Sequence, residues 1–93
     1  MTESICKVDK YGTKWWWLND HLHREDGPAV EYTNGAKSWY LNGKCHREDG
    51  PAIESMNEIN FWILNGQFIA KGKRPDNWDE LVAFSIVKKV MTE

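Results

Sequence analysis

The sequence predicts a mainly β protein with a C-terminal helix (an α+β fold), built as an antiparallel meander of β-hairpin repeats. Two observations predict the meander: a 23-residue period, and turn dipeptides that divide each period into short β-rich runs. A third observation, a capped amphipathic stretch near the C-terminus, predicts one helix packed on the sheet. With 93 residues, the chain is expected to form a single domain over residues 1–93.

Tryptophan marks the period. Trp16, Trp39 and Trp62 are 23 residues apart, and they begin the strings WWLND, WYLNG and WILNG. HREDGPA follows at 23–29 and again at 46–52, whereas the third copy reads IAKGKRP. We therefore expect a partial repeat over 5–22, a repeat over 23–45 and a repeat with a degenerate end over 46–70.

Turn dipeptides separate the predicted strands. The Asn-Gly pairs are strong signals for two-residue type I′ hairpins, because both central residues of that turn need φ > 0. Weaker pairs occupy corresponding places, and Asp-Gly-Pro makes the remaining turns, since proline cannot donate to a ladder. A meander of about nine short strands is expected. The turns are Tyr11-Gly12, Asn19-Asp20, Asp26-Gly27-Pro28, Asn34-Gly35, Asn42-Gly43, Asp49-Gly50-Pro51, Asn57-Glu58 and Asn65-Gly66.

Two-residue turns set the register, and the register assigns each side chain to a face of the sheet. Val30 is expected opposite Trp39 and Ala29 opposite Tyr40, and Tyr40 is also expected opposite Cys45. One face is then predicted to carry Trp16, Leu18, Val30, Trp39, Leu41, Ile53, Trp62 and Leu64, with His23 and His46 beside the tryptophans. The other is predicted to carry Trp15, Trp17, Leu22, Ala29, Tyr40, Cys45, Ala52, Phe61, Ile63 and Phe68.

Residues 77–91 are predicted to form the helix. Asp76 or Asn77 is a suitable N-cap, acidic residues occupy the first turn, and Lys88-Lys89 lies near the end, as the helix dipole favours. The expected buried stripe consists of Trp78, Leu81, Val82, Ile86 and Val90. So short a helix cannot cover the whole sheet, which leaves apolar surface for a partner or for a second copy in a homodimer.

Composition argues against several classes of function. The formal net charge is −2, and the 12 basic and 14 acidic residues are interspersed, so neither a phosphate-backbone footprint nor wholesale DNA mimicry is indicated. Cys6 and Cys45 lack CxxC spacing and are expected to be reduced thiols. The N-terminus lacks an apolar signal core and no stretch is long enough to span a membrane, so we expect a soluble cytoplasmic protein.

HREDGPA offers a metal site as one alternative, through His23, Glu25 and Asp26 and their equivalents 23 residues later. However, each histidine is predicted to lie across from a tryptophan, and Ile69 takes its place in the third copy. The tight ligand spacings typical of metal sites are also missing. We therefore predict no metal and no cofactor.

Catalysis and phosphate binding have less support. The Asp of HREDGPA immediately precedes Gly-Pro, where it usually accepts backbone N–H bonds, and no Ser/His/Asp or Cys/His arrangement has a convincing context. The glycines fall singly at turns and never open a helix. We predict that the protein is not an enzyme. Binding of RNA or single-stranded DNA remains an alternative, since aromatics alternate with Lys14, Lys37 and Lys44.

The string WYLNGKCHREDGPA (39–52), in a 23-residue hairpin unit, resembles the MORN-variant tandem β-hairpin repeats (membrane occupation and recognition nexus). The resemblance covers about residues 11–70 and is to the HREDGPA type, found in small bacteriophage and large-DNA-virus proteins. It implies an interaction scaffold, and related repeat proteins include bacterial immunity proteins that neutralise toxins.

We therefore expect a non-enzymatic protein-binding module. The resemblance suggests a phage accessory protein that masks a host protein or defence component, such as an anti-CRISPR-like inhibitor in the host cytoplasm. An antitoxin-type immunity protein and a single-stranded nucleic-acid-binding module are the alternatives. The candidate partner-binding residues are an aromatic set, Trp15, Trp17, Tyr40, Phe61 and Ile63, and a loop-rim set, Arg24, Glu25, Arg47 and Glu48.

Overall fold

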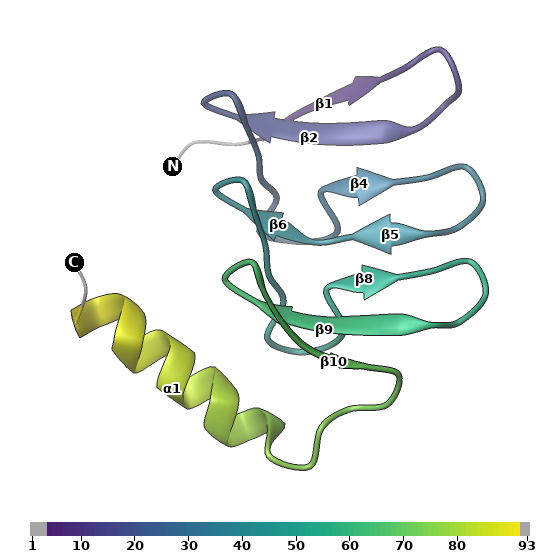
Figure 1. Cartoon of the computed structure of the whole chain (residues 1–93). Helices are drawn as coiled ribbons and strands as arrows, with labels where there is room; N and C mark the ends of the chain where they lie inside the picture. The colour runs from purple at the N-terminus through teal and green to yellow at the C-terminus, as the bar shows by residue number, and fades with distance from the viewer. Residues whose placement is uncertain (1–3, 92–93) are drawn as a thin grey trace.

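The computed structural model describes the backbone of residues 4–91 and the side chains of residues 4–85. It is mainly β, with a many-stranded antiparallel sheet followed by one C-terminal helix, α1 (Trp78–Met91), which confirms the predicted class (Figure 1). The strands are β1 (Ile5–Val8), β2 (Lys14–Leu18), β3 (His21–Leu22), β4 (Val30–Glu31), β5 (Lys37–Ser38), β6 (Tyr40–Leu41), β7 (Lys44–Cys45), β8 (Ile53–Glu54), β9 (Asn60–Leu64) and β10 (Gln67–Lys71).

Eight strands form one sheet in the order β1-β2-β4-β5-β8-β9-β10, with β3 beside β2, and β6 pairs with β7. Backbone hydrogen bonds join the β6–β7 hairpin to both neighbours: the Gly43 N–H donates to the Leu22 carbonyl (2.9 Å), and the Gly66 N–H donates to the Cys45 carbonyl (2.8 Å). The three hairpins β2–β3, β6–β7 and β9–β10 therefore stack along one side of the molecule (left in Figure 1).

Each of these hairpins closes with a two-residue turn. The turns are Asn19-Asp20, Asn42-Gly43 and Asn65-Gly66, and all six residues have φ between 50° and 80°. Such positive values at both central positions are those of a type I′ turn. The predicted pairing of Tyr40 with Cys45 is confirmed.

The turn at Asn34-Gly35 differs from the prediction because its loop contains three residues, 33–35. The Tyr32 N–H donates to the Ala36 carbonyl (2.9 Å), the Gly35 N–H donates to the Tyr32 carbonyl (3.1 Å), and Gly35 has φ 93°. Val30 therefore pairs with Ser38, and the predicted pairings of Val30 with Trp39 and of Ala29 with Tyr40 are wrong. Loops at 10–12 and 56–58 have the same hydrogen bonds and end in a residue with positive φ.

The extra loop residue exchanges four side chains between the faces, since a one-residue shift of register reverses every side chain. Val30 and Ile53 lie with Trp15 and Phe61, whereas Ala29 and Ala52 lie with the 23-spaced tryptophans. We name the two sides by their contents. The aromatic face carries Trp15, Trp17, Leu22, Val30, Ser38, Tyr40, Cys45, Ile53, Phe61, Ile63 and Phe68. The arginine face carries Trp16, Leu18, Ala29, Trp39, Leu41, Ala52, Trp62 and Leu64.

Helix α1 packs on the arginine face at its C-terminal end. Trp78 is buried in one cluster with Trp62 and Leu64, and Leu81 and Val82 pack around it. The Asn77 carbonyl accepts the first helical hydrogen bond, from the Leu81 N–H (3.1 Å), which places Asn77 at the N-cap. The predicted burial of Ile86 and Val90 lies outside the described side chains. Within residues 4–91, no helix combines the length and the apolar character that crossing a membrane requires.

Candidate functional site

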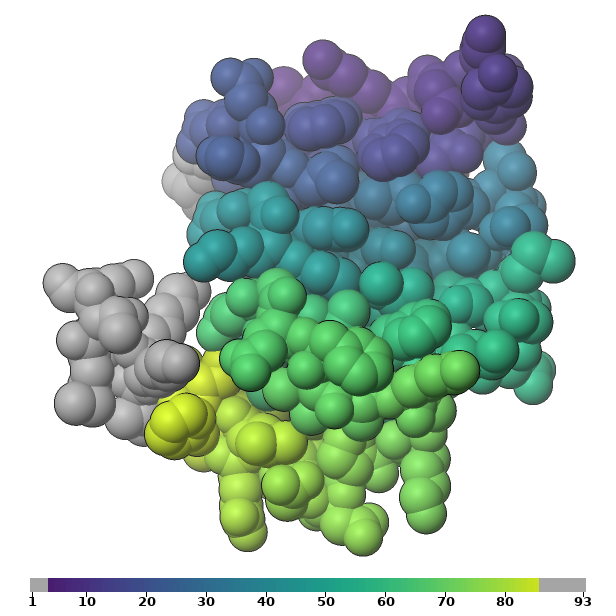
Figure 2. Space-filling view, viewed as in Figure 1, coloured from purple at the N-terminus to yellow at the C-terminus, as the bar shows by residue number. Residues whose placement is uncertain are grey.

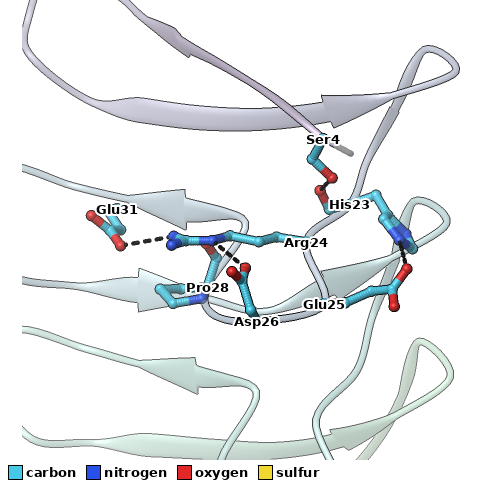
Figure 3. A network of polar contacts seen from close by, with 7 residues as sticks. All are labelled: Ser4, His23, Arg24, Glu25, Asp26, Pro28 and Glu31. Carbon is cyan, nitrogen blue, oxygen red and sulfur yellow. Dashed lines mark hydrogen bonds and ion pairs between the residues drawn. The ribbon is translucent and has the colours of Figure 1, made fainter. Parts of the chain in front are cut away.

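The first HREDGPA string (23–29, the first loop) wraps its arginine around the arginine face. The Arg24 guanidinium lies 3.9 Å from the centre of the Trp16 ring. Its Nε donates to Asp26 (3.0 Å), and its Nη1 donates to the Pro28 carbonyl and to Glu31 (both 3.1 Å) (Figure 3). The Arg24 side chain is only 22% exposed, so its charge is neutralised and its flat group is held against an indole.

The second HREDGPA string (46–52, the second loop) repeats this arrangement. The Arg47 guanidinium lies 3.8 Å from the Trp39 ring centre and donates to Asp49 (3.0 Å), to the Pro51 carbonyl (3.1 Å) and to Glu54 (2.9 Å). A Cβ added at Gly50 would lie 2.6 Å from the Arg47 Cζ. Glycine is therefore needed at this position because the guanidinium approaches the backbone.

The histidines of the two loops fasten each hairpin to the next. The Nδ1 of His23 accepts the backbone N–H of Asn42 (2.9 Å), and the Nδ1 of His46 accepts that of Asn65 (2.8 Å). The opposite ring nitrogen, Nε2, lies 3.2 Å from Glu25 in the first loop and 2.8 Å from Glu48 in the second. Because Nδ1 accepts, Nε2 carries the proton and donates to the carboxylate.

Both nitrogens of each buried histidine are therefore occupied by protein groups. In addition, Ser4 Oγ donates to the His23 carbonyl (Figure 3). Among the side chains of residues 4–85, no three or more His, Cys, Asp or Glu groups are placed to hold a metal ion. The chemistry of HREDGPA in this structure is that of a structural fastener.

The third hairpin lacks HREDGPA, and the helix supplies a substitute. Ala70 occupies the position 23 residues after Arg47, so it offers no guanidinium to Trp62. Instead, Trp78 packs edge-on against Trp62, with ring centres 5.0 Å apart and planes at 71°. The Trp78 indole N–H donates to the Glu48 carbonyl (2.7 Å), and the Trp62 indole N–H donates to the Gly72 carbonyl (2.8 Å).

An open groove of about 660 Å³ lies between the first and second loops. Trp39 and Leu41 contribute apolar surface to it, and charged residues of both loops form its rim. Asp26 and Asp49 are 87% and 88% exposed, whereas the arginines are held by intramolecular bonds. All four residues of the predicted loop-rim set line this groove, which presents mainly carboxylates to solvent. They are Arg24, Glu25, Arg47 and Glu48.

The predicted aromatic set lies together on the opposite side of the sheet. Trp15, Trp17, Tyr40 and Phe61 are half-buried on the aromatic face, and Ile63 is buried. Trp15 stacks edge-on against Tyr32, and its indole N–H donates to Asp9 (3.0 Å), which lowers the pKa of that carboxyl. Burial raises the pKa of the Tyr40 hydroxyl. The structure thus separates the aromatic set from the loop-rim set by the thickness of the sheet.

Three further side chains belong to the aromatic face and were not among the candidates. Val30 and Ile53 were predicted on the other side, and Phe68, which is 57% exposed, was placed correctly but not selected. A signal for the correct register was present in the charges. With a three-residue loop, Lys14, Glu31, Lys37 and Glu54 line up across four strands with alternating sign.

Two features bear on the alternative functions. Lys14, Lys37 and Lys44 lie on the arginine face, away from Trp15, Trp17 and Phe61. They therefore do not interleave with the exposed aromatic rings in the way that base stacking requires. Burial also raises the pKa of the Cys45 thiol to about 11, which keeps it protonated and weakly nucleophilic near neutral pH.

Comparison with known proteins adds no family assignment to this geometry. The resemblance to MORN-variant repeats stays a prediction from the residues. No protein-family model, curated protein or solved structure matches this chain.

Proposed function

We propose that this chain is a non-enzymatic protein-binding module that uses the aromatic face to cover part of another protein. One observation supports this most directly. Trp15, Trp17, Tyr40 and Phe61 gather on one side of the sheet, and each keeps part of its ring in contact with solvent. Tryptophan and tyrosine are favoured anchors of protein interfaces, because they bring a large apolar area and a polar atom at low entropic cost.

The position of the helix supports the same proposal. Among residues 4–91, the one element outside the strands is α1, and its described packing partners Trp62 and Leu64 lie on the arginine face. Figure 2 shows the coloured part of α1 (yellow) against the last part of the sheet (green), away from the first two hairpins (purple to teal). A contiguous apolar surface that a protein does not cover itself is typical of an interaction site.

The role of HREDGPA supports a scaffold over an enzyme. Its arginine, histidine and glycine are used to hold neighbouring hairpins together, through the same contacts at residues 23 apart. We infer that these recurring contacts are those of tandem hairpin repeats of the MORN-variant type. The resemblance to viral members of that type extends the proposal to a partner in a bacterial host, such as a defence protein in its cytoplasm.

The test is capture of a partner by the immobilised protein and by its face variants. Wild type, Trp17→Ala and Tyr40→Ala are incubated with bacterial lysate, and bound proteins are identified by mass spectrometry. We expect one or more proteins that wild type retains and at least one face variant loses. Circular dichroism and melting curves must show that both variants remain folded.

Phe84→Ala is the matched control, because Phe84 is 65% exposed on α1, outside the aromatic face. It is expected to retain the same proteins as wild type. If folded Trp17→Ala and Tyr40→Ala both retain everything that wild type binds, the aromatic face is not the binding surface. The loop-rim groove would then become the surface to mutate, beginning with Glu25 and Glu48.

A further inference from the structure

The charges on the aromatic face are all at its edges. One row of directly paired residues crosses seven strands: Lys7, Trp15, Val30, Ser38, Ile53, Phe61 and Lys71. The two lysines end this row on the outermost strands, β1 and β10, and both are exposed. Between them, the row contains only apolar residues and one serine.

No acidic residue of β1–β10 lies on this face. The strand carboxylates Glu31 and Glu54 are on the arginine face. Asp9, at the end of β1, already accepts the Trp15 indole N–H and the backbone N–H groups of Tyr11 and Thr13. The aromatic face of the described residues is therefore apolar at its centre and basic at both ends.

This pattern disfavours a second copy as the occupant. When two such faces are stacked by a twofold axis lying between them, the ends of the rows either coincide or exchange. In the first case Lys7 faces Lys7 of the other copy, and in the second it faces Lys71. Both arrangements oppose like charges, which lowers affinity at an interface.

We infer that the occupant of the aromatic face is a different protein, whose surface is apolar at its centre and carries carboxylates at both edges. This inference rests on the proposed function and specifies the chemistry of the partner. Carboxylates at the edges would pair with Lys7 and Lys71, while the apolar centre would cover the four aromatic rings. Nucleic acid fits less well, because two lysines at opposite ends do not form the continuous basic track that a phosphate backbone follows.

The chain itself supplies a defined probe. Lys7→Glu combined with Lys71→Glu produces the same apolar face with acidic edges. We expect wild type alone and the double variant alone to sediment as monomers, and an equimolar mixture to form a heterodimer in analytical ultracentrifugation. The mixed pair is expected to be about tenfold tighter than either self-pair and to weaken as salt is added.

Controls tie the association to the face. Lys14→Glu with Lys44→Glu places the same two charges on the arginine face, and its mixture with wild type is expected to stay monomeric. Trp17→Ala in either member of the active pair should abolish the heterodimer. If the double glutamate variant is unfolded by circular dichroism, Lys7→Gln with Lys71→Gln replaces it and should self-associate more than wild type does.

The possible failures are distinguishable from one another. Self-association of wild type that Trp17→Ala removes would overturn the acidic-edge inference and leave the aromatic face as a binding surface. A mixture that stays monomeric, beside a lysate partner that still depends on Trp17, would do the same. Binding of single-stranded oligodeoxythymidine with a steep salt dependence, lost in the double variant, would show that the occupant is nucleic acid. If nothing binds through Trp17 in any of these experiments, both the inference and the proposed function are wrong.

Discussion

The first two hairpins and the third protect the same tryptophan position in different ways. Trp16 and Trp39 are each covered by an arginine from the loop that follows, with the guanidinium 3.9 and 3.8 Å from the ring centre. Trp62 is covered by Trp78, which arrives from the helix. The first solution uses residues 8 positions along the chain, and the second uses a residue 16 positions along it.

This difference shows what the HREDGPA loop needs from its surroundings. Arg24 and Arg47 lie at the open groove between the loops and keep about a fifth of the side chain exposed, which suits a charged group with paired carboxylates. Trp78 is 1% exposed, so a guanidinium there would have to be buried. An indole with one hydrogen bond to the Glu48 carbonyl closes the stack without burying a charge.

Removing the indole should have the largest effect. Trp78→Ala deletes a fully buried aromatic side chain and its hydrogen bond, and should lower the free energy of unfolding by about 4 kcal/mol. Chemical denaturation followed by far-UV circular dichroism measures the change. Phe84→Ala on the exposed side of the same helix is the control and should change stability by less than about 0.5 kcal/mol. A similar loss in both variants would mean that Trp78 does not close the stack.

Removing an arginine should cost less, because the site is partly solvated. Arg47→Ala loses the cation–π contact and leaves Asp49 and Glu54 without their donor, so we expect a loss of about 2 kcal/mol. Arg47→Lys should recover less than half of that loss, since an ammonium group lacks the flat fork. Full recovery by lysine, measured by urea unfolding, would show that charge alone matters at this position.

The histidine links should contribute about 1–2 kcal/mol each, through the backbone N–H that their Nδ1 satisfies. His46→Ala leaves the Asn65 N–H without that acceptor, whereas His46→Asn offers a carbonyl oxygen at a similar place. We expect asparagine to be the more stable of the two variants. Amide hydrogen exchange at Asn65 reports the link directly, and unchanged protection in His46→Ala would exclude it.

The smallest expected effect separates the two loops themselves. An added Cβ would lie 2.6 Å from the Arg47 Cζ at Gly50, but 3.0 Å from the Arg24 Cζ at Gly27. We expect Gly50→Ala to cost about 1 kcal/mol and Gly27→Ala less, because both displace a guanidinium from its indole by different amounts. Thermal melts of the two variants side by side would test this order, and a greater loss at Gly27 would contradict it.

The fold was largely predictable from local signals, and the error came from an ambiguous one. Asn42-Gly43 and Asn34-Gly35 have the same two letters, but the second belongs to a loop that begins at Thr33. A three-residue loop ending in a left-handed glycine and a type I′ turn both favour Asn-Gly, so the dipeptide cannot distinguish them. The alternating charges of Lys14, Glu31 and Lys37 distinguish them when read across strands.

The site was less predictable than the fold. Residue type and register placed Trp15, Trp17 and Tyr40 on one face, because strand alternation is a local property. The stacking of Arg24 on Trp16 depends on how a loop folds back over the strand before it, which no short pattern encodes. The role of Trp78 required knowing that the helix lies on the arginine face, and amphipathicity alone does not select a face.

The short span of the histidine links has a consequence for the order of folding. His23 reaches Asn42 and His46 reaches Asn65, so each link joins residues 19 positions apart. Contacts of such low sequence separation form rapidly, and each can form as soon as the next hairpin leaves the ribosome. Trp78 reaches back 30 positions to Glu48, so the last hairpin must wait for the helix. We therefore expect folding during synthesis to proceed from the N-terminus and to be completed by the final turns of the chain.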